Sequence, residues 1–127
     1  MTGRRLRPRG VLPGWLVADP PPRRPVRSDL GAQIEPGWQQ GAACAATDLD
    51  PDCWFTERGN PAHTAARTIC GSCPVRRSCL ANALAIAEPA GIWGGADETE
   101  RAQLLQAIAE GVPVAVVLGP GPSRAVA

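Results

Sequence analysis

The chain has 127 residues, with 14 Gly and 14 Pro; this length accommodates one domain, and no stretch approaches the roughly 20 apolar residues of a membrane-spanning helix. Its formal net charge of +1 conceals an asymmetry, because residues 1–27 carry seven Arg and one Asp while residues 28–127 carry six Arg and eleven acidic residues. A basic arm therefore precedes a mildly acidic body, which is the asymmetry of an interaction tail.

The arm, residues 1–36, is expected to be disordered because it is rich in Pro and Arg and its PPPRRP stretch favours extended chain. Arg4 and Arg5 precede a short apolar run, as in a targeting signal. Pro13-Gly14 interrupts that run, however, and no small-residue cleavage site follows it, so we do not expect a signal peptide. We expect a cytoplasmic protein, in which clustered cysteines bind metal or do redox chemistry more often than they form structural disulfides.

The body, residues 37–111, is expected to be all-α and to begin with two short helices. The segment WQQGAAC, residues 38–44, can form the first. A loop rich in turn-forming residues follows. Asn60 and Pro61 are then suited to the cap and the first position of a second helix, which runs into Cys70.

Two further helices and a tail are expected after the second helix. The third helix is expected over residues 75–88. Asp97 and Glu100 have the spacing of a capping box, which predicts a fourth helix over residues 98–110. The tail, residues 112–127, is apolar and expected to be flexible. A bundle of about four short helices buries little apolar surface, so it needs a cross-link that holds the helices together.

Four cysteines are the obvious candidates for this cross-link. The stretch CGSCPVRRSC places Cys70, Cys73 and Cys79 within ten residues, and Cys44 lies well upstream. Four thiolates complete a zinc site, but zinc sites more often use two CxxC pairs or Cys/His pairs. Three clustered ligands and one distant ligand suit the larger [4Fe-4S] cube, whose corners need ligands from several directions. Spacing alone therefore favours iron–sulfur slightly and leaves zinc open.

Three neighbouring features have other interpretations. Cys53, beside Trp54, is expected to be a small apolar filler rather than a ligand. His63, the one histidine, lies at the start of a helix and is expected to be a surface residue. Cys70 and Cys73 have the spacing of a thioredoxin-type redox pair, but that motif needs a βαβ context that this sequence lacks.

With GIWGG placed a short helix after the cysteines, the chain resembles the WhiB-like family of actinobacterial iron–sulfur transcription regulators. The resemblance covers about residues 38–110 and includes a Trp ahead of the first cysteine, the acidic loop DLDPDCWF, CGSCPVRRSCL and the later ETER. In that family four cysteines ligate one [4Fe-4S] cluster, which implies Cys44, Cys70, Cys73 and Cys79 as ligands here. Zinc becomes a minor alternative.

The resemblance also implies roles for the aromatic residues. In the family, the Trp of the glycine turn and the aromatics near the first cysteine line the cluster pocket and contact the promoter-reading C-terminal domain of the primary sigma factor. This implies partner binding by Trp38, Trp54, Phe55 and Trp93, with the turn shaped by Gly91, Gly94 and Gly95. The alternative is that Trp93 merely covers the cluster.

DNA contact is the point at which this chain departs from the family. Members usually carry a run of Lys and Arg after the last helix, whereas here one Arg, Arg124, follows residue 101. Phosphate neutralisation needs several cations. The arm supplies candidates for this contact: Arg4, Arg5, Arg7, Arg9, Arg23, Arg24 and Arg27. The alternatives are a solvated arm and DNA contact left to the sigma partner.

On this resemblance we expect a redox- or nitric-oxide-responsive transcription regulator, not an enzyme, with one [4Fe-4S] cluster per subunit. Its expected partners are the primary sigma factor and DNA, with no membrane, and the apo-form is a candidate for DNA binding. On oxidation, freed thiols are expected to form a disulfide bond, first between Cys70 and Cys73. The rivals are a zinc-holding interaction module and an apo-form protein disulfide reductase that uses this same pair.

Overall fold

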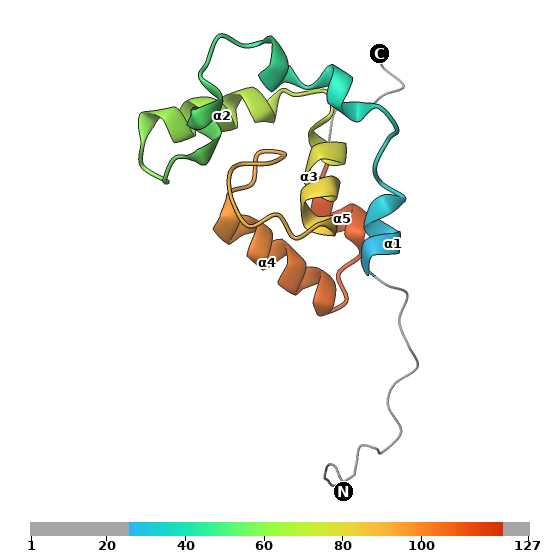
Figure 1. The fold of residues 1–127 in the computed structure, drawn as a ribbon. Coiled ribbons are helices and arrows are strands. Elements are labelled where there is room, and N and C mark those ends of the chain that lie inside the picture. Colours follow the sequence, from blue (N-terminus) through green and yellow to red (C-terminus); the bar gives the residue numbers. More distant parts are fainter. Residues whose placement is uncertain (1–25, 121–127) are drawn as a thin grey trace, which may run out of the picture.

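A computed structural model describes residues 26–120, and over this range the fold is all-α, as expected (Figure 1). Helix α1 is followed by three short 3-10 helices in succession and then by four further α-helices. Their bounds are α1 Val26–Gly31, η1 Trp38–Gly41, η2 Ala43–Ala46, η3 Pro51–Phe55, α2 Pro61–Gly71, α3 Arg76–Ala85, α4 Glu98–Ala109 and α5 Val114–Leu118. None of the helices in this part of the chain has the length and apolar character needed to cross a membrane.

The starts of α2 and α4 follow the capping residues that the sequence predicts. The Asn60 side chain accepts a hydrogen bond of 2.8 Å from the backbone N–H of Ala62, and Pro61 occupies the first turn. The Asp97 side chain accepts from the backbone N–H of Glu100 at 2.9 Å, and the Glu100 side chain accepts from the backbone N–H of Asp97 at 3.0 Å. Both predicted caps are therefore confirmed.

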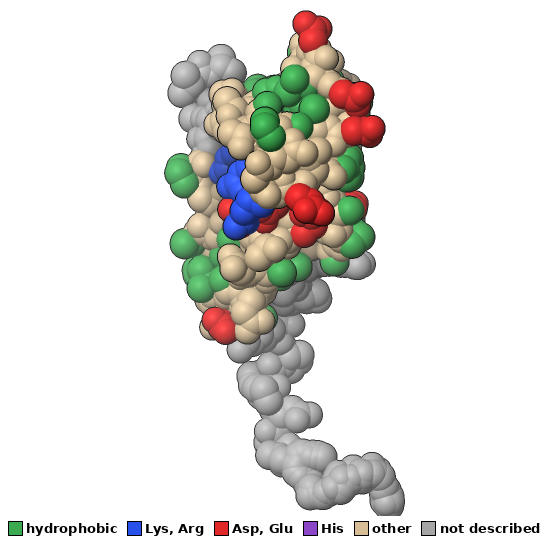
Figure 2. Space-filling model, turned by 90° about the vertical axis from the view of Figure 1, so that its left-hand side faces the viewer, with side chains coloured by type: hydrophobic (Ala, Val, Ile, Leu, Met, Phe, Trp, Pro, Cys, Tyr) green, Lys and Arg blue, Asp and Glu red, His purple; other side chains and the backbone are tan. Residues whose placement is uncertain are grey.

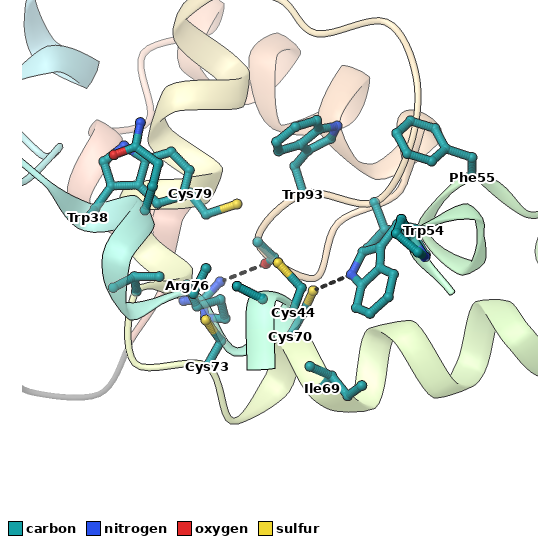
Figure 3. Close-up of a pocket in the computed structure, with 17 residues that line it drawn as sticks. Trp38, Cys44, Trp54, Phe55, Ile69, Cys70, Cys73, Arg76, Cys79 and Trp93 are labelled. Atoms are coloured by element: carbon teal, nitrogen blue, oxygen red, sulfur yellow. Dashed lines mark hydrogen bonds between the residues drawn. The ribbon is translucent and has the colours of Figure 1, made fainter. Parts of the chain in front are cut away.

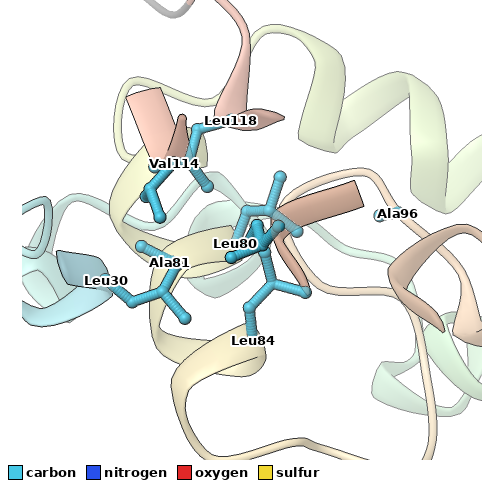
Figure 4. Packing of buried hydrophobic residues seen from close by; sticks show 8 residues of the cluster. Leu30, Leu80, Ala81, Leu84, Ala96, Val114 and Leu118 are labelled. Carbon is cyan, nitrogen blue, oxygen red and sulfur yellow. The ribbon is translucent and has the colours of Figure 1, made fainter. Parts of the chain in front are cut away.

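Helix α3 lies at the centre of the molecule, with α1 and α5 packed against one side of it and α2 above it in Figure 1. Its apolar face carries the main hydrophobic core, in which side chains from α1, α3 and α5 point toward one another (Figure 4). The buried members are Leu30, Leu80, Ala81, Leu84, Ala96, Ile108, Val114 and Leu118. The opposite side of α3 is left for the pocket described below.

Two expected boundaries of the domain are wrong. Residues 26–36 belong to the body rather than to the arm, because α1 packs on α3 and its Leu30 is completely buried. Residues 112–120 are not a flexible tail, because they include α5, and Leu118 is only 1% exposed. Each helix is too short for its apolar residues to show a period, so its burial depends on the surface of α3. Residues 1–25 and 121–127 lie outside the described residues.

The first and third expected helices are also shorter than predicted. Residues 38–44 form two separate 3-10 turns, because Ala42 between them has an extended backbone with φ −67° and ψ 123°. Helix α3 ends at Ala85 rather than at residue 88, and Ala87 adopts a left-handed φ of 53° just beyond it. The chain there turns into the glycine-rich segment that closes the pocket.

Candidate functional site

A pocket of about 420 Å³ lies between the 3-10 helices, the end of α2, the start of α3 and the glycine-rich turn (Figure 3). It brings together all four cysteines predicted as ligands and all four aromatics predicted to bind a partner. Its lining includes Cys44, Cys70, Cys73, Cys79, Trp38, Trp54, Phe55 and Trp93. These residues come from segments up to about half the chain apart in sequence, so the fold has assembled them.

The four thiols differ in exposure and approach the pocket from different elements. Cys70 and Cys73 are buried, Cys79 is half-buried and Cys44 is exposed, and all are free thiols. The indole Nε1–H of Trp54 donates to Cys70 Sγ at 3.4 Å, and the backbone N–H of Ala43 donates to Cys73 Sγ at 3.3 Å. Among the described residues, no three metal-ligating side chains converge closely enough to hold a single ion.

The surroundings of Cys44 and Cys79 oppose isolated negative charge on their thiols. Burial raises the pKa of Cys79 to about 12, with smaller contributions from the other cysteines. Burial also raises the pKa of Cys44, and the negative charges of Cys70 and Cys73 add to the effect. Without a positive partner Cys44 and Cys79 therefore stay protonated, whereas a metal group would supply the charge that stabilises their thiolate forms.

The aromatic residues form a graded cover over the pocket. Trp54 is buried, Trp38 and Trp93 are half-buried, and Phe55 is 57% exposed. The backbone N–H of Ile92 donates to the carbonyl of Trp54 at 2.7 Å, which joins η3 to the glycine-rich turn. In Figure 3, Trp93 and Phe55 lie along one edge of the pocket. An apolar ring at this edge is therefore open to solvent.

The glycine-rich turn is a tight hairpin. Trp93 and Ala96 exchange two backbone hydrogen bonds of 3.0 Å, and Gly94 and Gly95 between them have φ values of 58° and 82°. Positive φ at both central residues is the requirement of a two-residue hairpin turn, and glycine meets it without strain. A Cβ on Gly91 would lie 2.6 Å from Phe55 Cε1. The three predicted glycines thus shape the turn, and Gly94 also lines the pocket.

Arg101 fixes this turn through hydrogen bonds to backbone carbonyls, a role that was not predicted from the sequence. Its side chain is buried and donates to the carbonyls of Gly91, of Ala96 at 2.7 Å and of Glu88 at 3.1 Å. Its position inside a predicted helix, on the side that carries Leu104, Leu105 and Ile108, was the available signal. A buried guanidinium needs several acceptors, and the carbonyls of a glycine-rich turn supply them.

Arg76 and Arg77, between two of the cysteines, point in different directions. Arg76 lines the pocket and donates to the carbonyls of Gly94 at 3.4 Å and Leu118 at 2.8 Å. Arg77 turns away from the pocket and donates to the carbonyl of Gly119 at 2.9 Å. The pair thus connects the segment that carries the cysteines to the end of α5.

The expected surface position of His63 is wrong, whereas the expected role of Cys53 as an apolar filler is consistent with the fold. His63, expected at the surface, is only 3% exposed, and its Nε2 lies 3.7 Å from Asp97 Oδ2. Ion pairs of Arg58 and Arg67 with the start of α4 cover it, and Figure 2 shows basic and acidic side chains side by side on this face. Cys53 is half-buried and packs against an apolar cluster that includes Trp54, as a filler would.

The predicted DNA-binding arginines of the arm cannot be placed. Arg4, Arg5, Arg7, Arg9, Arg23 and Arg24 lie outside the described residues, and only the backbone of Arg27, in α1, is described.

Comparison with known proteins connects this pocket to a family. The family model described as Transcription factor WhiB matches residues 38–104, just over half of the chain and the segment that holds all four pocket cysteines. The chain belongs to the WhiB family. The family resemblance predicted from the sequence is therefore confirmed.

Individual WhiB relatives are similar across most of the described body. The transcriptional regulator WhiB of Streptomyces coelicolor is 46% identical over 60% of this chain and 84% of its own length. WhiB2 of Mycobacterium tuberculosis is 42% identical over 66% of this chain and 91% of its own length. WhiB2 of Mycolicibacterium smegmatis is 47% identical over 58% of this chain, which spans about half (55%) of that relative. All three relatives are named transcriptional regulators.

The pocket of this WhiB-family chain fits a polynuclear metal group. Four sulfur donors line the same pocket, whose volume is about 420 Å³. Two of these sulfurs already accept hydrogen bonds from the chain. Four thiolates are the donor set of a [4Fe-4S] cluster, which is larger than a single ion. The residues that would hold it are Cys44, Cys70, Cys73 and Cys79.

Proposed function

We propose that this WhiB-family chain is a transcription regulator that holds one [4Fe-4S] cluster through Cys44, Cys70, Cys73 and Cys79. It responds to redox change or nitric oxide in the cytoplasm, acts with the primary sigma factor or DNA, and is not an enzyme. The observation that carries this proposal is one pocket lined by four free thiols and four aromatic side chains. When bound, the cluster supplies a group that reacts with oxygen and nitric oxide.

The chain's own residues adjust how such a group is held and reached. The N–H groups of Trp54 and Ala43 donate to the sulfurs of Cys70 and Cys73, and hydrogen bonds to ligand sulfurs tune the potential of a cluster. Cys44 is exposed, so solvent and small molecules reach the pocket beside it. The aromatic cover restricts access elsewhere. This arrangement suits a sensor more than a purely structural centre.

The exposed edge of the aromatic cover supports contact with a protein partner. Phe55 is 57% exposed and belongs to the same cover as Trp93, whose Nε1–H is fixed by a 2.8 Å hydrogen bond to the Ala90 carbonyl. A rigid, partly exposed aromatic is the type of anchor that dominates protein interfaces. The sigma domain expected from the family resemblance would bury this edge.

The described body itself has few cationic side chains available to bind the phosphates of the DNA backbone. Each of its arginines with a described side chain donates to a carboxylate or to a backbone carbonyl: Arg58, Arg67, Arg76, Arg77 and Arg101. Phosphate binding needs several available cations. DNA contact therefore falls to the arginines of residues 1–27 or to the sigma partner.

The cofactor is tested by anaerobic purification with measurement of iron, sulfide, zinc and the visible spectrum. We expect brown protein with about four iron atoms per chain, and loss of the cluster in each of Cys44→Ala, Cys70→Ala, Cys73→Ala and Cys79→Ala. Cys53→Ala is the matched control and should keep the cluster. Colourless protein with stoichiometric zinc would support the zinc module instead, and thiol-dependent turnover by the apo-protein would support the reductase.

The partner is tested by co-purification of the anaerobic protein with the C-terminal domain of the primary sigma factor. Trp93→Ala should leave iron and sulfide unchanged and weaken sigma binding by about 2 kcal/mol or more, as expected for an aromatic anchor. If the variant binds sigma as tightly as the parent, Trp93 only covers the pocket.

A further inference from the structure

Exposed acidic residues flank a residue of the pocket lining in the sequence. Pro51 lines the pocket, and Asp50 and Asp52 on either side of it are exposed, as is Asp48. The Asp50 carboxylate accepts a 2.8 Å hydrogen bond from the backbone N–H of Asp52, which fixes this rim. The ion pairs found among the described residues leave these three carboxylates unneutralised. The mouth is therefore an apolar surface with a negative edge.

Phe55 adds the apolar part of the same surface. It follows Asp52 in η3, it is 57% exposed, and its ring lies against Gly91 of the hairpin. A contact surface with an aromatic centre and a carboxylate rim selects a segment with an apolar anchor and flanking cations. Such a segment is present in this chain.

The first 25 residues have the complementary pattern. They carry six Arg and one Asp, and the run VLPGWLVA, residues 11–18, lies between the two groups of arginines. The described range, residues 26–120, carries six Arg and eleven acidic residues. The two parts of the chain are thus opposite in charge, and Trp15 is the one large aromatic of the basic part.

Distance permits contact within one molecule. Ten residues lie between Trp15 and Val26, the first residue of α1, and the eleven steps along the chain span up to about 36 Å when extended. A body of this size has a radius of gyration of about 12 Å. Helix α1 ends at Gly31, and Trp38, seven residues further on, already lines the pocket. The arm therefore starts close enough for Trp15 to reach the mouth.

We propose that residues 1–25 dock in cis on the aromatic mouth of the pocket, with Trp15 against Phe55 and the flanking arginines against Asp48, Asp50 and Asp52. The docked arm covers the surface that a partner protein would use, so it limits partner binding until it is displaced. The second statement rests on the proposed function, whereas the docking itself does not.

The test is amide hydrogen exchange on the full-length protein, purified anaerobically, with iron and sulfide measured in every sample. Two variants each remove one half of the contact: Trp15→Ala, and Asp48→Asn combined with Asp50→Asn and Asp52→Asn. Asparagine keeps the capping hydrogen bond of residue 50 while it removes the charge. Glu110→Gln, which removes an exposed acid at the far end of α4, is the matched control.

We expect several-fold faster exchange at residues 51–55 and 91–95 in both variants, with no change in α4 and none in the control. High salt should have the same effect on the parent, because it screens exposed charges. Equal exchange in parent and variants would overturn the docking, and an effect of Trp15→Ala alone would overturn the charge complementarity. Protection that increases with protein concentration would assign the contact to a second copy instead.

Partner binding separates this inference from the proposed function. If the arm limits access, the variant Trp15→Ala should bind the sigma domain several-fold more tightly than the parent. A sigma domain that binds neither protein would contradict the proposed function and leave the exchange result standing. Tight and equal binding by both would overturn the inhibitory role of the arm.

Discussion

At the scale of single residues, Gly94 is the position near the pocket at which a side chain is least tolerated. Its φ is +58°, and a Cβ built on it would lie 2.5 Å from Leu80 Cβ and 2.8 Å from the Arg76 carbonyl oxygen. The hairpin therefore packs directly on the backbone of α3. A side chain at this position would push Trp93 and the cover of the pocket away from the cysteines.

Replacing Gly94 by Ala should destabilise the protein by about 2–5 kcal/mol, because a left-handed conformation and overpacking each cost energy. Gly37→Ala is the matched control. It also has a left-handed φ, +73°, but nothing lies within 4 Å of its added Cβ. That variant should lose only about 1–2 kcal/mol. Urea unfolding of the two variants measures the difference, and equal losses would show that the hairpin does not press on α3.

Asp97 is the residue through which acid should loosen the body. Burial disfavours its charge, but hydrogen bonds from the Glu100 N–H and the Arg58 guanidinium outweigh burial and hold the pKa of Asp97 below its ordinary value of 3.8. A lowered folded pKa contributes stability above the ordinary pKa, and this contribution is lost as the pH falls through the folded pKa.

The substitution Asp97→Asn should therefore cost about 1 kcal/mol at neutral pH and flatten the loss of stability below about pH 4. Asparagine still caps α4, whereas Asp97→Ala also loses the cap and should cost about 1 kcal/mol more at every pH. Urea unfolding as a function of pH tests both expectations. If the asparagine variant loses stability at acid pH as steeply as the parent does, Asp97 is not the source of that loss.

At the scale of the elements, α5 depends on α3 for its place. Arg76 donates to the carbonyls of Leu118 and Pro120, and Arg77 donates to those of Gly119 and Ala115. The last carbonyls of a helix have no partner within it, so the two guanidinium groups satisfy them. The segment that carries the cysteines thus also fixes the C-terminal part of the fold.

Truncating Leu118 should therefore behave as a core substitution. Leu118→Ala is expected to cost about 2–5 kcal/mol, since the side chain is 1% exposed and its removal leaves a cavity. Val116→Ala on the same helix is the control, with the valine 66% exposed and an expected change within about 0.5 kcal/mol. Chemical denaturation distinguishes them. If both variants lose equally little stability, α5 does not contribute to the core and behaves as a flexible tail.

At the scale of the whole molecule, α3 separates two regions with different sources of stability. One face meets the apolar core of α1, α4 and α5, which contains no cysteine. The other borders the pocket, where short 3-10 helices hold Cys44 and the aromatic cover. The two regions should therefore respond differently when a metal group is removed.

Removing the metal with an anaerobic chelator should loosen the pocket side first. We expect amide protection of residues 38–55 to fall strongly, while the amides of α3 and α4 keep most of theirs, because apolar packing holds them. Hydrogen exchange before and after chelation measures this order. A uniform loss over both regions would show that the cysteines stabilise the whole body, as the sequence analysis assumed when it required a cross-link.

Local sequence determined the features whose physics is local. The caps at Asn60 and Asp97 depend on side chains two or three residues from their partners, and the hairpin of Gly94 and Gly95 depends on positive φ, so all three could be predicted. The cysteine spacing and the glycine turn also identified the family. The ligand and partner roles derived from it stay predictions.

Burial at four positions was decided by tertiary structure alone. Leu30 and Leu118 lie in helices too short to show a hydrophobic period, and they are buried because α3 offers a face on which both pack. His63 and Arg101 became interior residues because Asp97 and the carbonyls of the hairpin came to lie beside them. Hydrophobic burial and polar satisfaction depend on what the rest of the chain brings close, whereas caps and turns depend on immediate neighbours.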